Sequence, residues 1–177
     1  MESPPVVEEQ KYNSIFFDAL PESDSYVMTL MGVDSKGVID FDYKGTVTRA
    51  QAVELHWGTK VDGKPYFFKT WPKKWITAPK SHTALAYKAL TGELPITLDA
   101  KDIVGKAALI TIENVTKTSS KGTHYTASKQ IGTPTKVPSS MRAMVVDYSD
   151  LLGPWEEAMT PRDENVEEAV EGSDAPF

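Results

Sequence analysis

Residues 46–71 carry the pattern that most restricts how this chain can fold. Side chains at every second position of Thr46 to Trp57 can share one face of a β-strand, with valine, leucine and tryptophan toward its end. Asp62-Gly63 follows, and this pair is typical of the two-residue turn of a β-hairpin. Pro65 to Trp71 is then the expected return strand. A helix is the competing interpretation of the Ala-rich middle of the first segment, but the turn favours a strand.

The rest of the chain shows further strand signals and one helix. Ser81 is a typical N-cap and Gly92 a typical residue just past a helix end, so a short helix is expected between them. A small helix or docking segment is expected at Leu151–Met159. Strands are expected at Ser25–Val33, Val38–Tyr43, Ala107–Val115 and Thr123–Ile131, with turns at Asp34–Gly37 and Thr118–Gly122.

This order of elements predicts a fold class. About five strands with one short helix between the third and fourth is the element order of an OB-fold, a five-stranded Greek-key barrel that binds oligonucleotides on one face. We therefore expect a mainly β, OB-fold-like barrel, with SH3-like barrels and sandwiches as alternatives. The expected organisation is an N-terminal arm at 1–24, a nucleic-acid-binding OB-fold domain at 25–135, and a linker with a disordered acidic tail at 136–177.

The net charge of −6 is unevenly distributed along the chain. Residues 1–43 contain nine acids and two bases, and residues 143–177 contain ten acids and one base. The middle, residues 44–142, contains sixteen bases and six acids. A basic body between acidic ends is expected of a protein that binds a polyanion.

Lys60 to Trp75 interleaves five aromatic residues with five lysines. A groove for single-stranded nucleic acid needs both, because cations neutralise phosphates and rings stack on bases. The alternative is a hairpin with a lysine-rich solvent face. Phe67, Lys69 and Trp71 are the first choice for a ligand-binding face. The candidate nucleic-acid-binding residues are Arg49, Trp57, Lys60, Lys64, Phe67, Lys69, Trp71, Lys73, Lys74, Trp75, Lys80, Tyr125 and Lys129.

Other chemistries have little support in the sequence. Gly58 to Lys64 is close to a phosphate-binding loop, but Pro65 stands where Ser or Thr is needed and no helix is expected to follow. The three histidines lie on separate expected elements and cysteine is absent, so we expect no metal site and no cofactor. No catalytic residues are predicted and we expect a non-enzyme. The absence of cysteine and of a signal-peptide pattern favours the cytoplasm.

The acidic C-terminal run ends in Asp174-Ala175-Pro176-Phe177. It resembles the acidic, Phe-terminated tip with which bacterial and phage single-stranded DNA-binding proteins recruit partners. This resemblance implies that Asp174, Pro176 and Phe177 bind replication or recombination proteins.

The body combines an expected strand pair, Lys80-Ser81 before a helix, Gly105-Lys106 before a strand, and a turn at Gly122. In these features it is similar to phage-type single-stranded DNA-binding OB-fold proteins. This similarity implies sequence-tolerant binding of single-stranded DNA in replication, recombination or repair, with a homodimer left open. The alternatives are a β-barrel structural, virion or interaction protein that does not bind nucleic acid, and a nuclease, for which no carboxylate cluster is evident.

Overall fold

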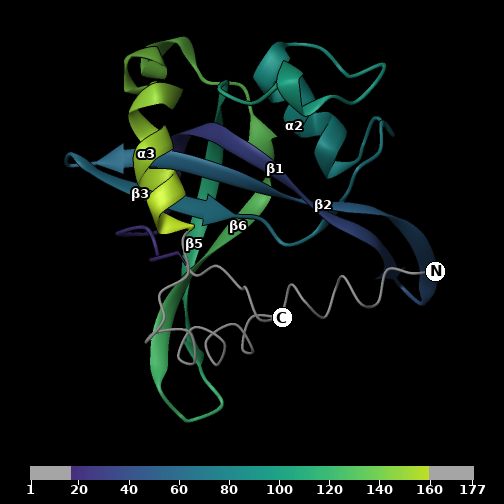
Figure 1. The fold of residues 1–177 in the computed structure, drawn as a ribbon, viewed down its shortest axis with the longest axis horizontal. Helices are drawn as coiled ribbons and strands as arrows, with labels where there is room; N and C mark the ends of the chain where they lie inside the picture. Colours follow the sequence, from purple (N-terminus) through teal and green to yellow (C-terminus); the bar gives the residue numbers. More distant parts are fainter. Residues whose placement is uncertain (1–16, 160–177) are drawn as a thin grey trace.

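The structure, a computed structural model, describes residues 17–159. Its main feature is a set of long antiparallel strands with short helices packed on both sides (Figure 1). None of the described helices is long and apolar enough to cross a membrane. The elements are β1 (Asp24–Tyr43), β2 (Thr46–Val61), β3 (Lys64–Lys69), β4 (Lys73–Lys74), α2 (His82–Thr91), a 3-10 helix at Ala100–Asp102, β5 (Ala107–Thr118), β6 (His124–Thr135), a 3-10 helix at Ser139–Met144 and α3 (Tyr148–Ala158).

The strands form one antiparallel sheet in the order β3-β2-β1-β5-β6, and β4 pairs with β2 beyond the end of β3. The predicted mainly β class is therefore confirmed. Within residues 17–159 no strand ladder joins β3 to β6, so the hydrogen-bonded path is open between these two strands rather than closed into a barrel.

The hairpin predicted around Asp62-Gly63 is confirmed, and both residues have positive φ, at 52° and 80°. The same type of turn, at Lys44 and Gly45, joins β1 to β2. The turn predicted at Asp34–Gly37 is wrong. β1 continues through it with a bulge between Ser35 and Gly37, because continuous pairing with β2 outweighs the local turn signal.

The helix predicted between Ser81 and Gly92 is also confirmed. The Ser81 Oγ accepts a 3.1 Å hydrogen bond from the backbone N–H of Ala84, and Gly92 adopts φ 95° at the C-terminal end. α2 buries Ala86, Tyr87 and other apolar residues and contacts β6 and β5.

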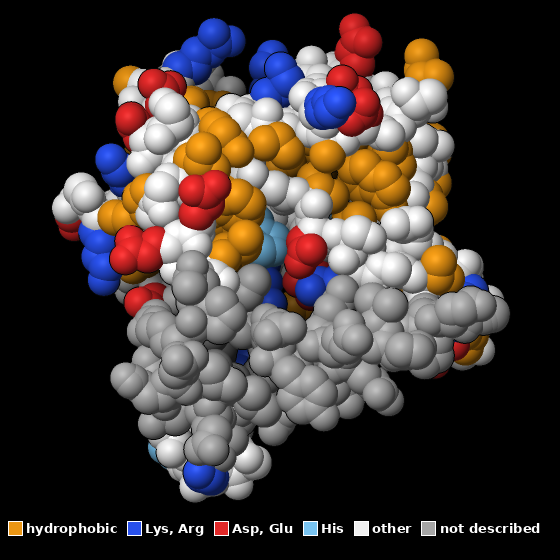
Figure 2. All heavy atoms as spheres, viewed as in Figure 1, with side chains coloured by type: hydrophobic (Ala, Val, Ile, Leu, Met, Phe, Trp, Pro, Cys, Tyr) orange, Lys and Arg blue, Asp and Glu red, His pale blue; other side chains and the backbone are white. Residues whose placement is uncertain are grey.

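Both faces of β2 are covered, and residues 52–59 are all buried. Val53, Leu55 and Trp57 point into the main core with residues of β1, β5 and α2. Alternate residues point to the other face, where α3 packs Leu151 against Met31 and Phe67. This second core confirms the helix expected near Leu151–Met159. Hydrophobic side chains form a band across the face that carries α2 and α3 (Figure 2).

Two long hairpins project from the packed body. Figure 1 shows the tip of the β1–β2 hairpin and the tip of the β5–β6 hairpin extending away from the helices in different directions. All residues from Asp42 to Arg49 at the first tip are exposed. Residues at these tips therefore lie beyond the packed cores.

Candidate nucleic-acid interface

Two of the aromatic residues predicted to stack on bases lie in the interior. Trp57 is 0% exposed and faces the main core, where it pairs across the strands with Phe68. Phe67 is 6% exposed and packs with Met31 and Leu151 beneath α3. The prediction is therefore wrong for both rings, because a buried ring cannot reach a base. The three residues Phe67, Lys69 and Trp71 therefore do not form one exposed ligand-binding face, because Phe67 is buried.

Several other predicted residues have partners within the fold. Trp75 is half-buried and packs on Tyr87, with ring centroids 6.5 Å apart. Lys69 forms an ion pair with Glu54 at 3.7 Å, and exposed Arg49 forms one with Asp40 at 3.0 Å.

Three of the predicted lysines and Tyr125 lie elsewhere on the fold. Lys60 and Lys64 flank the β2–β3 turn, and exposed Lys80 precedes α2. Half-buried Tyr125 lies on β6 opposite Lys117. These four residues do not belong to the lining of the pocket described next.

Three predicted residues do come together, in a pocket of about 170 Å³. Trp71 follows β3, Lys73 belongs to β4 and Lys129 to β6, so the pocket lies where the two ends of the open sheet meet. Trp71 is 51% exposed, unlike the other rings near it. We call this site the β3–β6 pocket; its lining is Phe68, Thr70, Trp71, Lys73, Lys129 and Gln130.

A third cation beside Trp71, Lys117 of β5, was not predicted. Its Nζ lies 5.9 Å from the centroid of the Trp71 ring, a cation–π distance. Only the fold brings these residues together, because they are distant in the sequence and belong to different hairpins. The arrangement combines an exposed ring with three lysines, one over the ring and two in the lining of the same pocket, which suits a base stacked on the ring and phosphates beside it.

Burial affects the charges of this site. Desolvation lowers the pKa of Lys73. Burial, with a smaller effect of Lys73, lowers the pKa of His82 to about 4, so this histidine is neutral near pH 7. Within the part of the chain that the structure describes, no carboxylate forms an ion pair with Lys73 or Lys129. A partly desolvated amine without a carboxylate partner favours an anionic ligand.

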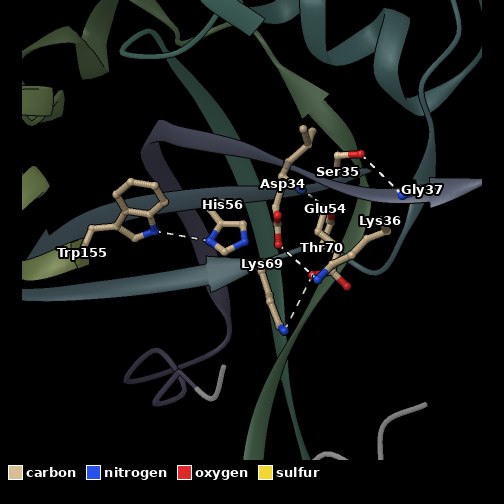
Figure 3. Close-up of polar contacts among 10 residues, drawn as sticks. Asp34, Ser35, Lys36, Gly37, Glu54, His56, Lys69, Thr70 and Trp155 are labelled. Carbon is tan, nitrogen blue, oxygen red and sulfur yellow. Dashed lines mark hydrogen bonds and ion pairs between the residues drawn. The ribbon is translucent and has the colours of Figure 1, made fainter. Parts of the chain in front are cut away.

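A second polar cluster lies on the other face of the sheet, between β1, β2 and α3 (Figure 3). Asp34, Glu54 and His56 place ligand-type atoms within 4.8 Å of one another. Lys36 lies 3.1 Å from Asp34 and 3.5 Å from Glu54, and Lys69 also pairs with Glu54. The carboxylates are therefore already neutralised by lysines.

The tautomer of His56 also fits a metal poorly. The Trp155 Nε1 donates a hydrogen bond of 3.3 Å to the His56 Nδ1. The proton of a neutral imidazole must then lie on Nε2, which removes the lone pair that a metal would need. Burial lowers the pKa of His56 to about 4, which keeps the ring neutral. We interpret this cluster as an ion-pair network within the sheet, which the hydrogen bond between Trp155 and His56 links to α3.

The predicted partner-binding residues Asp174, Pro176 and Phe177 lie outside the described residues. Comparisons with protein-family models, curated proteins and solved structures find no significant match to this chain.

Proposed function

We propose that this protein binds single-stranded DNA with little sequence preference and that the β3–β6 pocket is the centre of its binding surface. The observation that carries this proposal is the exposed ring of Trp71 with Lys73, Lys117 and Lys129 around it. Exposed aromatic rings with flanking cations are the recurring feature of proteins that bind single strands. The excess of bases in residues 44–142 supports the same activity.

The topology supports an OB-fold interpretation of the sheet. The path β3-β2-β1-β5-β6, with α2 between β4 and β5, is that of a five-stranded OB barrel opened between its third and last strands. In that interpretation the β3–β6 pocket is the opening itself. A strand that enters there meets groups from both ends of the sheet, which explains why ring and cations come from different hairpins.

We also propose a role in replication, recombination or repair, in which the acidic C-terminal segment recruits partner proteins. This part rests on the sequence resemblance to phage-type single-stranded DNA-binding proteins and on the six acids and one base in residues 160–177. The same segment is a tethered polyanion beside a basic surface, so it also competes with DNA for that surface.

Substitution of the exposed ring tests the proposal. Trp71→Ala should weaken binding of a fluorescein-labelled poly(dT) oligonucleotide by about 5- to 150-fold, which corresponds to the ~1–3 kcal/mol of one base–ring stack. Because the ring is 51% exposed, the variant should keep its far-UV circular dichroism spectrum and unfolding temperature. Fluorescence anisotropy measures the affinity.

Lysine variants provide the matched control. Lys129→Gln removes a cation of the pocket, whereas Lys60→Gln removes an exposed lysine at the β2–β3 turn. We expect the first to weaken binding and the second to have a much smaller effect. If folded Trp71→Ala and Lys129→Gln both bind like the wild type, the pocket is not the binding site. Equal affinity for poly(rU) would extend the substrate to RNA.

A further inference from the structure

The β1–β2 hairpin beyond the bulge at Gly37 forms an arm that none of the helices within residues 17–159 covers (Figure 1). Its strands pair regularly from Val38 opposite Gln51 to Tyr43 opposite Thr46. The arm exposes large apolar side chains: Tyr43 is 70% exposed and Val47 is 59% exposed. These exposed apolar side chains do not contribute to the core of the protein. Exposed apolar side chains that lie close together often mark a binding surface.

The two faces of the arm differ in chemistry. Directly opposed residues of a strand pair point to the same side, and successive residues alternate. One face therefore presents Ile39, Phe41, Tyr43, Thr46, Thr48 and Ala50, which include two rings and no acid. The opposite face presents Val38, Asp40, Asp42, Val47, Arg49 and Gln51, which include two acids and one base. We call the first the ring face of the arm.

Cations complete the ring face. The Lys44 Nζ lies 5.2 Å from the centroid of the Tyr43 ring, and the Lys74 Nζ lies 5.6 Å from that of Phe41. On the opposite face the charges are used within the arm. Arg49 pairs with Asp40, and the Asp42 Oδ1 accepts a 3.0 Å hydrogen bond from the backbone N–H of Gly45. A polyanion would therefore be attracted to the ring face and not to the acidic face.

β4 connects the ring face to the β3–β6 pocket. Lys73 lines the pocket, and its neighbour Lys74 lies over Phe41. Consecutive residues of a strand point to opposite sides, so this two-residue strand presents one lysine to each surface. A single strand that passes over the β4 edge would therefore meet one lysine on the pocket side and one on the arm side.

We propose that the ring face of the arm is a second binding segment for the single strand held in the β3–β6 pocket, with bases stacking on Tyr43 and Phe41. This inference rests on the proposed function and specifies its substrate as strands long enough to reach both surfaces. Ala52, opposite Lys74, and Thr46 at the tip are six residues apart, so the arm adds about 20 Å at ~3.3 Å per residue. That length holds about six nucleotides at the ~3.4 Å spacing of stacked bases.

The test compares two oligonucleotide lengths and three variants. A short poly(dT) of about six nucleotides should occupy the pocket alone, and one of about sixteen, the upper end of OB-fold site sizes, should also cover the arm. Tyr43→Ala removes a ring from the ring face, and Val47→Ala is its matched control on the opposite face at the same tip. Trp71→Ala reports on the pocket. Anisotropy titrations give the affinities, and light scattering gives the oligomeric state.

We expect Tyr43→Ala to weaken binding of the long oligonucleotide by about 5- to 150-fold and to leave the affinity for the short one unchanged. Val47→Ala should change neither affinity, and Trp71→Ala should weaken binding of both oligonucleotides. Wild-type affinity of Tyr43→Ala for the long strand overturns the arm proposal while the pocket stands. An altered oligomeric state with unchanged affinity also overturns it, since the arm would then bind a second copy. If only Tyr43→Ala weakens binding, the arm is supported and the pocket fails as the proposed centre.

Discussion

Lowering the pH from about 7 to about 5 should destabilise this protein by an amount that includes a calculable contribution from His56. Burial lowers the pKa of His56 to about 4 from 6.5, so the unfolded chain binds a proton more readily than the folded one. The contribution of His56 to stability is therefore fully present above pH ~6.5, decreases as the pH falls below that value, and is lost by about pH 4. Linkage gives a loss of about 2 kcal/mol at about pH 5 from this residue.

Protonation of His56 would disrupt its contact with α3. The Trp155 Nε1–H donates to the His56 Nδ1, and a protonated imidazole has no acceptor to offer. Acid should therefore loosen α3, which packs Leu151 and Trp155 on this face of the sheet. Amide hydrogen exchange should show early loss of protection in Tyr148–Ala158.

Urea denaturation at the two pH values measures the effect in the wild type and in His56→Gln. The glutamine cannot take up a proton, but its carbonyl can still accept from Trp155, so its pH-dependent loss should be smaller by about 2 kcal/mol. His124→Gln, at an exposed histidine of β6, is the control and should lose as much as the wild type. Equal losses in wild type and His56→Gln, or an NMR titration of the wild-type His56 ring near its ordinary pKa, would refute the reasoning.

Two further predictions follow from the packing and the charge. Gly32→Ala should destabilise the fold by about 1–3 kcal/mol in urea denaturation, because a Cβ there would lie 2.9 Å from the Trp155 ring, while Gly153→Ala, with nothing within 4 Å, should be neutral or stabilising. Deleting residues 160–177 should tighten DNA binding at low ionic strength and much less at high ionic strength, because a tethered acidic competitor is removed. Unchanged affinity of the truncated chain at low salt would contradict the competition.

Local signals predicted the elements whose ends are marked by turn or cap chemistry. Asp62-Gly63 has both residues at positive φ, and Ser81 and Gly92 bound α2. Such residues define a backbone shape without help from the rest of the chain. The sequence Asp34–Gly37 has the same kind of signal, yet β1 runs through it, because thirteen residues of β1 pair with β2 on both sides of the bulge.

The candidate binding residues were harder to predict, because alternation does not tell which face of a strand is covered. Trp57 and Trp71 both follow strand-like patterns, but Trp57 faces the main core and Trp71 lies past the end of β3. Phe67 is buried in a cluster with Met31 and with Leu151 of α3, which returns to the sheet from far along the chain. Lys117, Phe41 and Tyr43 were missed since their ring–cation pairs form only through tertiary and turn geometry.

The salt dependence of DNA binding tests the central claim most directly. Four lysines lie at or next to the proposed pocket: Lys73 and Lys129 line it, Lys117 lies over the Trp71 ring, and Lys74 follows Lys73 on β4. If each neutralises one phosphate, the slope of log affinity against log salt should be about −3, so affinity for poly(dT) should fall about 150-fold between about 50 and 300 mM salt. Quenching of the intrinsic tryptophan fluorescence reports the titration. Tight binding with this slope is the predicted result, and absent or salt-independent binding would contradict the proposed function.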